Sequence, residues 1–310
     1  MENKEEIYKH KFSFGISLEI TIEDYKKIIN KYKNYISSIY FSLPLGKEFH
    51  TREAVEKEYS RNDAREKLID ILDLFKENNI KLEAVINQYF ISNKKILEAI
   101  KYLKEEINVD SICTLDEYAY LIKQHFPDMY LVSSFNNFNK TRKNIYNNSK
   151  IYNQIVIGRN FLRDIEIMKY IKSLGLDIKL LLNNGCSFNC RTCRAGEKTC
   201  KSIFENNLKK FSFEELYALQ SFFPYELDIL KQKINLLNIK EFKISNRPCT
   251  YKYLDDCLNS YIYNHNEEDY LKEDINNYRL WGRLTHFSKY FREMDINEIK
   301  RIKNEIWNLE

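Results

Sequence analysis

The chain has 310 residues, 44% hydrophobic and 14% aromatic, which is enough to bury a large core in one or two domains. Its 49 basic and 45 acidic residues nearly cancel, so a net charge of +4 gives no electrostatic reason to expect nucleic acid or an anionic membrane as partner. No apolar run reaches the roughly 20 residues that span a bilayer, and segment 1–14 has no apolar signal core. We therefore expect a cytoplasmic protein without a membrane partner.

Short β-branched or aromatic runs alternate with longer helical patterns, which is typical of parallel βα units. The predicted strands are 11–18, 36–43, 81–88, 109–114, 129–135, 153–158, 177–183 and 241–245. The predicted helices, with apolar residues at three- and four-residue spacing, are 21–34, 64–79, 92–106, 115–126 and 161–175. Eight repeats predict a (β/α)8 TIM-barrel-like fold. An open doubly wound sheet is the alternative, but its glycine-rich first turn is missing from "SFGISLEI".

The sequence has no linker rich in Pro, Gly or Ser that would mark a second domain. We predict a barrel domain over 1–265, which includes a cysteine-rich insertion at 184–240 after the seventh strand, and a C-terminal helical extension over 266–310. Helices are expected near the C-terminus, at 251–264 and 295–310. The charged excursion 44–63, after the second strand, is interpreted as a solvated lid helix.

Four of the seven cysteines lie inside the predicted insertion, in one stretch of fifteen residues with the spacing C-x3-C-x2-C-x6-C. A fifth cysteine follows the last predicted strand. In a reducing cytosol thiols are more often free or metal ligands than disulfides. Four close thiolates suit a tetrahedral zinc or a [4Fe–4S] cluster, and the spacing favours iron–sulfur, because structural zinc usually uses two separate knuckles. The alternative is a set of small buried hydrophobes. The candidate metal ligands are Cys186, Cys190, Cys193, Cys200 and Cys249; Cys113 and Cys257 are assigned to the core.

C-x3-C-x2-C is also the signature of radical S-adenosylmethionine enzymes. In that family the motif follows the first strand of the barrel, an aromatic residue usually precedes the last cysteine, and a glycine-glycine-glutamate run follows the next strand. Here the motif follows the seventh predicted strand, Thr192 precedes Cys193, and that run is missing. S-adenosylmethionine is therefore not expected as a cofactor, although a radical enzyme stays an alternative.

Polar residues that follow the strands are expected at the C-terminal mouth of a barrel, where barrel enzymes build their sites. Arg159 and Arg247 could hold a carboxylate or phosphate, or equally form ion pairs at the rim. Lys243, inside an apolar strand, could serve as a base or Schiff-base nucleophile, but pairing with an acid such as Glu83 is favoured. The candidate catalytic residues are Lys243, Arg247 and Arg159. The candidate substrate-binding residues are Asn87, Ser134, Arg159, Asn183 and Arg247.

Two stretches, "DIKLLLNNGCSFNC" and "LNIKEFKISNRPCTYKYLDDCLNSYI", resemble the collagenase-like peptidase family, unassigned-peptidase family thirty-two. The second stretch is similar to a family strand followed by Arg and Tyr, with Asn246 where the family usually has Gly. The residues that carry this pattern are Ile239, Phe242, Lys243, Ile244, Arg247 and Tyr253. The resemblance extends over most of residues 11–265.

The resemblance implies a barrel-like fold with a cysteine-bound iron–sulfur cluster, in a family with members that act in oxygen-independent hydroxylation of ubiquinone precursors or RNA. We therefore expect an iron–sulfur enzyme that modifies a small molecule, peptide or RNA. Proteolysis has no support, because G-x-S-x-G and H-E-x-x-H are both missing. The expected ligands are Cys186, Cys190, Cys200 and Cys249, with Cys193 as a substitute for any of them. A second alternative is a non-catalytic zinc- or cluster-stabilised module with a protein partner.

Overall fold

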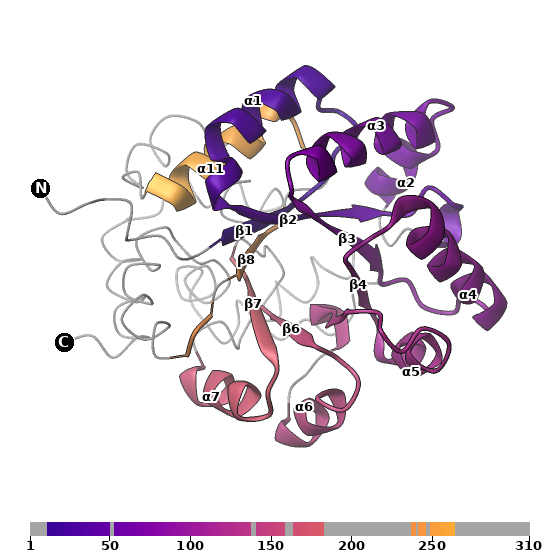
Figure 1. Ribbon diagram of the computed structural model, residues 1–310, viewed down its shortest axis with the longest axis vertical. Coiled ribbons are helices and arrows are strands. Elements are labelled where there is room, and N and C mark those ends of the chain that lie inside the picture. Colours follow the sequence, from indigo (N-terminus) through magenta and orange to yellow (C-terminus); the bar gives the residue numbers. More distant parts are fainter. Residues whose placement is uncertain are drawn as a thin grey trace, which may run out of the picture.

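The computed structural model describes residues 11–49, 53–137, 141–158, 164–182, 237–239, 241–245 and 249–263. Eight parallel strands follow one another around a closed barrel, and β8 closes it by pairing with β1. Helices surround the barrel on the outside (Figure 1). The predicted (β/α)8 fold is confirmed.

Each of the eight predicted strands forms, and its paired part is shorter than predicted. The strands are β1 (Lys11–Gly15), β2 (Ile36–Ser42), β3 (Lys81–Ile86), β4 (Ser111–Thr114), β5 (Leu131–Ser133), β6 (Gln154–Ile157), β7 (Asp177–Leu181) and β8 (Glu241–Ile244). Buried side chains continue past the last paired residue, as at Ile16 and Leu18 after β1. The apolar pattern therefore continues beyond the end of the paired strand, which is why the predicted strands are longer than the observed ones.

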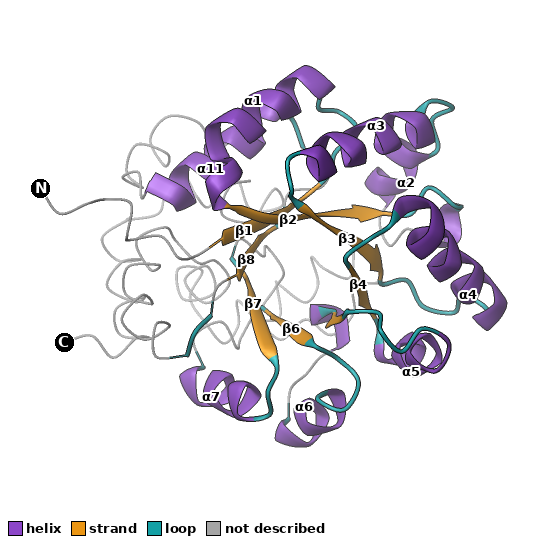
Figure 2. Ribbon diagram, viewed as in Figure 1, coloured by secondary structure: helices purple, strands orange, loops and turns teal. Residues whose placement is uncertain are grey.

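The helices alternate with the strands (Figure 2). They are α1 (Ile22–Tyr32), α2 (Glu53–Tyr59), α3 (Ala64–Glu77), α4 (Asn93–Tyr102), α5 (Asp116–His125), α6 (Arg142–Asn148), α7 (Ile165–Ser173) and α11 (Tyr251–Tyr263). Side chains of Thr21, Ser92, Thr141 and Asp164 cap α1, α4, α6 and α7 by accepting a hydrogen bond from a backbone N–H three residues on. The five helices predicted between residues 21 and 175 are all found; α6 was missed because its seven residues are too few to show a clear helical period.

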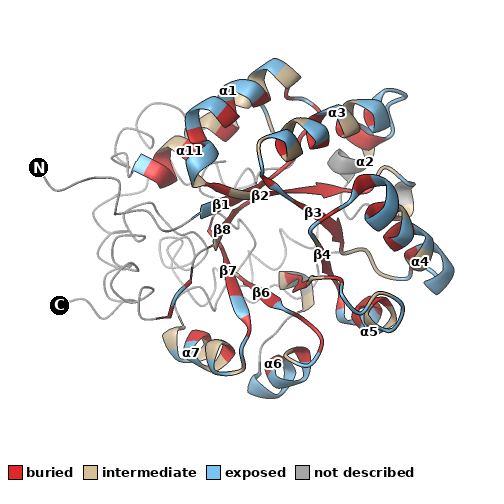
Figure 3. Ribbon diagram, in the orientation of Figure 1, coloured by how far each residue is buried: buried red, intermediate tan, exposed pale blue. Residues whose placement is uncertain are grey.

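The barrel separates two groups of buried apolar side chains. The larger group lies between the strands and the inner faces of the helices, which are buried while their outer faces are exposed (Figure 3). Phe75 of α3, for example, meets the rings of Phe14 and Tyr25 edge-on, with centroids 5.9 and 5.4 Å away. The smaller group comprises Tyr40, Val85, Cys113, Val132, Val156 and Leu181. Because successive side chains of a strand point to opposite faces, this second group fills the inside of the barrel.

The excursion 44–63 contains the expected helix, but this helix is not fully solvated. The helix is α2, and Glu58 and Tyr59 at its end are only 4% and 7% exposed. The charge of the segment suggested solvent exposure, but one of its carboxylates is used inside the protein. Cys113 and Cys257 are buried as predicted.

Helix α11 confirms the predicted helix at 251–264 and packs against α1 outside the barrel. Tyr32 donates a hydrogen bond of 2.8 Å to Asp255, and Lys31 lies 3.0 Å from the same carboxylate. Insertion 184–240, apart from residues 237–239, and extension 266–310 lie outside the described residues. Among the described helices, none combines the length and apolarity needed to cross a membrane.

We predict that Leu258→Ala lowers the free energy of unfolding by about 2–5 kcal/mol, because Leu258 is fully buried on α11 and its loss leaves a cavity. Urea denaturation followed by circular dichroism measures the change. Lys252→Ala, on the exposed side of the same helix, is the control. Equal stability of the two variants would mean that Leu258 of α11 does not contribute to the apolar core between the strands and the helices.

Candidate functional site

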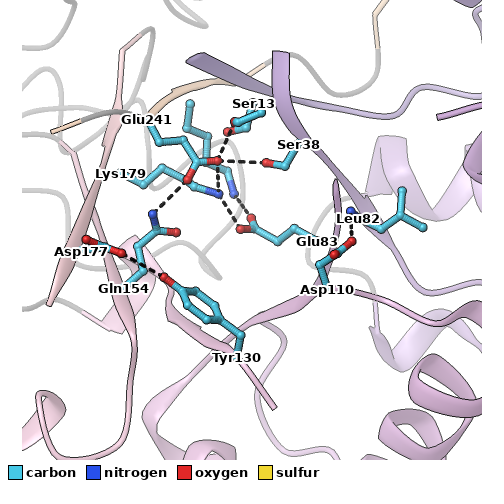
Figure 4. Close-up of polar contacts among 12 residues, drawn as sticks. Ser13, Ser38, Leu82, Glu83, Asp110, Tyr130, Gln154, Asp177, Lys179 and Glu241 are labelled. Atoms are coloured by element: carbon cyan, nitrogen blue, oxygen red, sulfur yellow. Dashed lines mark hydrogen bonds and ion pairs between the residues drawn. The ribbon is translucent and has the colours of Figure 1, made fainter. Parts of the chain in front are cut away.

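The inside of the barrel contains charged side chains. Glu83 precedes the interior residue Val85 by two positions in β3, and Lys179 precedes Leu181 by two in β7, so both share the inward face. Both are nearly inaccessible to solvent, at 0% and 2% exposed. Figure 4 shows them pointing toward each other and toward Glu241 of β8.

These side chains form a series of alternating charges. Lys179 Nζ lies 3.0 Å from Glu241 Oε1 and 2.7 Å from Glu83 Oε2. The other oxygen of Glu83, Oε1, lies 2.7 Å from Lys243 Nζ. The order is therefore Glu241, Lys179, Glu83, Lys243, and the four charges sum to zero. We call these four residues the interior charge series. The predicted pairing of Lys243 with Glu83 is confirmed.

Glu241 lies at the start of the series and is held by three neutral donors. Ser37 Oγ donates to its Oε1 at 2.8 Å, Ser38 Oγ to the same oxygen at 3.0 Å, and Gln154 Nε2 to Oε2 at 2.9 Å. These donors come from β2 and β6, on two sides of the barrel. Hydrogen bonds of this kind offset the cost of removing a carboxylate from water.

The electrostatics keep Glu83, Lys179 and Glu241 ionised at neutral pH. Burial alone raises the pKa of Glu83, but the ammonium groups of Lys179 and Lys243 outweigh it and hold that pKa at about 2. Burial lowers the pKa of Lys179, yet the carboxylates of Glu241 and Glu83 raise it above its ordinary value. Burial raises the pKa of Glu241, but the charge of Lys179 and the hydrogen bonds from Gln154 and Lys179 together lower it below its ordinary value.

Cys113 lies in the same interior. Burial raises the pKa of its thiol to about 11, although the charge of Lys243 and a hydrogen bond with Ser134 oppose this shift. The thiol is therefore protonated at neutral pH, unlike a metal-bound or nucleophilic cysteine. Two predicted site residues, Ser134 and Lys243, therefore both interact with the Cys113 side chain, Ser134 by a hydrogen bond and Lys243 through its charge.

A second polar group lies where the chain leaves β1, β2 and β8. Glu58 Oε1, on α2, accepts hydrogen bonds from Ser17 Oγ at 2.8 Å, from Glu19 N at 3.1 Å and from Leu18 N. Cys249 N donates to Ser17 Oγ at 3.2 Å. These contacts fix the segment after β8 to the segment after β1. We call Glu58, Ser17 and Cys249 the mouth anchor.

Tyr25 of α1 also holds Ser17 of the mouth anchor. Its hydroxyl accepts a hydrogen bond from Ser17 N and donates one to Ser17 O, both at 2.9 Å. Ser17 is therefore bound through its backbone N–H, its carbonyl and its side chain. Cys249, one of the predicted metal ligands, is half-buried beside it.

Glu58 uses only one of its two oxygens in this group. Within the described residues its Oε2 is buried and has no hydrogen-bond partner. Burial raises the pKa of Glu58 above its ordinary value of 4.5, although the donors from Ser17, Leu18 and Glu19 oppose this. A half-satisfied buried carboxyl group at a barrel mouth can accept a hydrogen bond from a ligand or hold a proton at Oε2.

The remaining predicted residues divide into two sets. Asn87 follows β3 and is half-buried, and Ser134 follows β5 and is buried, with its N–H bonded to the Thr114 carbonyl. Within the described residues no three His, Cys, Asp or Glu side chains are grouped as a metal site would require. The predicted residues that lie outside the described ranges are Arg159, Asn183, Arg247, Cys186, Cys190, Cys193 and Cys200.

Sequence reasoning missed Lys179 and Glu241 as site residues, and Glu58 altogether. A signal for Lys179 was present. Lys179 is the third residue of the strand "DIKLL", as Lys243 is the third residue of the strand "EFKI", so both lysines occupy the same place in an apolar strand. No local signal marks Glu58. Its partners are about forty residues away in the chain, and its neighbours in sequence are charged.

Comparisons with known proteins identify no family. No protein-family model matches the chain, and no curated protein matches it. Among solved structures it is similar to the U32 peptidase Mk0906, with 12% identity and a TM-score of 0.48 over 76% of this chain and 92% of that one. It is also similar to the tryptophan synthase α-subunit of Pyrococcus furiosus, with 8% identity and a TM-score of 0.43 over 80% and 91% of the two chains. At such scores the family resemblance stays a prediction.

We predict that Glu83→Gln destabilises the protein by about 3–5 kcal/mol, because it leaves Lys243 and Lys179 with too little negative charge in a buried place. The double variant Glu83→Gln/Lys243→Met removes one acid and one base and should cost less. Thermal and urea unfolding compare the variants.

The pH dependence provides a further check on Glu83. Its pKa is about 2 in the folded protein against an ordinary 4.5, so its stabilising effect is present above pH 4.5 and is lost as the pH falls toward 2. Glu83→Gln should therefore lose less stability than the wild type over that range. The same acid sensitivity in both proteins would contradict the assigned pairing.

For Glu58 we predict the opposite pH dependence. Because its pKa is raised in the folded protein, its ionisation disfavours the fold as the pH rises above 4.5. Glu58→Gln keeps an acceptor for the three donors and removes this effect. Its stability relative to the wild type should increase between pH 4 and pH 8 in unfolding curves. Asp63→Asn, at an exposed carboxylate, is the control, and a difference for Glu58→Gln that stays constant with pH would refute the raised pKa.

Proposed function

We propose that the protein is an iron–sulfur enzyme that holds a [4Fe–4S] cluster at the C-terminal mouth of the barrel and modifies a small molecule, peptide or RNA. The observation that carries the proposal is the position of Cys249. This predicted ligand follows β8 by five residues and is tied by the mouth anchor to the segment after β1. It therefore lies at the end of the barrel where sites of this fold are built.

The topology supports a shared site for the other cysteines. Strands β7 and β8 are paired, with Leu181 opposite Lys243, so both leave the barrel at the same edge. Cys186 follows the end of β7 by five residues, as Cys249 follows the end of β8. Five residues span at most about 18 Å. Both thiols can thus reach one point at the mouth, and the C-x3-C-x2-C spacing supplies the further ligands that a cluster needs.

The residues of the mouth fit a reaction beside such a cluster. When bound, a [4Fe–4S] cluster supplies one-electron redox or Lewis-acid chemistry. Glu58 offers a buried carboxyl oxygen for a hydrogen bond or a proton, and Lys243 presents an ammonium group from the barrel interior. Asn87, half-buried after β3, is a further polar candidate for orienting a substrate.

We predict that protein purified without oxygen shows broad absorption near about 400 nm and contains about four iron and four sulfide per chain. Cys186→Ala, Cys190→Ala and Cys249→Ala should each lose most of this absorption, because a thiolate ligand is removed. Cys113→Ala and Cys257→Ala, which change buried cysteines inside and outside the barrel, should retain it.

The outcomes of this experiment discriminate between the functions. Stoichiometric zinc without iron, or absorption that does not depend on Cys186 and Cys249, would refute the cluster and favour a zinc-stabilised module. Production of 5′-deoxyadenosine from S-adenosylmethionine by the reduced protein would assign it to the radical enzymes instead. An iron–sulfur cluster that depends on Cys186 and Cys249, in a protein that does not cleave S-adenosylmethionine, supports the proposal.

A further inference from the structure

The interior charge series has a direction along the barrel axis. Lys243 lies two residues closer than Glu241 to the C-terminal end of β8. Lys179 and Glu83 connect the two, so that the series begins on a carboxylate and ends on an ammonium group. Within the series, the charge nearest the mouth is therefore positive, although the series as a whole is neutral.

Lys243 is less fully coordinated than the other interior lysine. Within the described residues its Nζ contacts one carboxylate oxygen, of Glu83, and lies 3.9 Å from the centre of the Tyr40 ring. The Tyr40 hydroxyl donates to the Ile244 carbonyl at 2.6 Å, which fixes the ring. Lys179 contacts two carboxylates. An ammonium group has three N–H donors, so Lys243 retains capacity for a further acceptor.

Within the described residues, no second side chain accepts a hydrogen bond from Lys243 Nζ. The apolar side chains that line the barrel with Tyr40, and the protonated thiol of Cys113, offer no strong acceptor. The inward position of β1 that follows Ser13 is Gly15, which adds no side chain to the interior. The side chain of Lys243 is 8% exposed, against 2% for Lys179. An anion that approaches from the mouth would thus meet Nζ before it meets the Glu83 carboxylate.

We infer that Lys243 binds the anionic group of the substrate, a carboxylate or a phosphate, inside the C-terminal mouth of the barrel. Glu83 and Tyr40 act as positioning residues, because they hold the ammonium group without using all of its donors. The inference rests on the proposed function only in taking this mouth as the place where substrate enters. It narrows the substrate to an anionic molecule or group.

The test is a titration of the full-length protein with inorganic phosphate, acetate and chloride at equal ionic strength, read out as the melting temperature. Glu83→Gln/Lys243→Met removes the last pair of the series without changing the net charge. Lys252→Met/Asp256→Asn removes an exposed pair of the same kind on α11 and is the matched control.

We expect phosphate or acetate, but not chloride, to raise the melting temperature of the wild type and of the control variant. The interior variant should bind the effective anion at least about tenfold more weakly, because its charged donor is gone. A response to phosphate alone identifies a phosphorylated substrate, and a response to acetate alone identifies a carboxylate. The inference is overturned if the interior variant folds and responds to the anions like the wild type. It is also overturned if phosphate and acetate raise the melting temperature of the wild type no more than chloride does.

Two further measurements keep the result unambiguous. If the interior variant does not fold, ¹⁵N-lysine labelling of the wild type replaces it: the Nζ signal of Lys243 should move on addition of the anion while that of Lys179 stays, and an unmoved Lys243 signal overturns the inference. Iron is measured in the same samples. A missing anion response with full iron content contradicts this inference alone, whereas missing iron contradicts the proposed function.

Discussion

The structure depends on one buried carboxylate, that of Glu83, which lies between two buried ammonium groups. A charge in the barrel interior is costly unless it is paired and hydrogen-bonded. Glu83 meets this requirement with Lys179 of β7 and Lys243 of β8, across the barrel from its own strand. Glu241 extends the pairing to β2 and β6 through Ser38 and Gln154. A change of register in any of these strands would leave a charge without its partner.

The pairing of these charges also determines which residues lie together at the C-terminal mouth of the barrel. Since β7 and β8 are held in register by the interior charges, the segments that follow them leave the barrel side by side. The segment after β8 is then tied to the segment after β1 by Cys249 and Ser17, and Glu58 of α2 closes the group. The interior charge series and the mouth anchor thus place a candidate metal ligand, a half-satisfied carboxyl group and a cation at one end of the barrel.

Sequence reasoning reached the strands, and it named Glu83 as one acid that could pair with Lys243, because a strand and an isolated charge within it are visible in local patterns. A short β-branched run predicts a strand wherever it occurs, and a lone lysine in an apolar strand requires an acid of some kind. Glu58 was not accessible in this way. It looked solvent-exposed among the charges of 44–63, yet it is buried because Ser17, Leu18 and Glu19 supply three donors from a distant part of the chain. Lys179 was missed for a related reason, since its two carboxylate partners lie on strands far away in sequence.

The amino-acid sequence by itself determined the order of the eight strands, the helices between them and hence the barrel, because the alternation of periods is local and parallel βα units have few ways to close. It also concentrated the cysteines after the seventh strand. Only the tertiary structure decided which charges share the interior, which carboxylate supports Cys249, and that Lys243 carries the charge of the interior charge series nearest the mouth. These features depend on contacts between residues that are about forty to more than two hundred positions apart, and no local pattern records such distances.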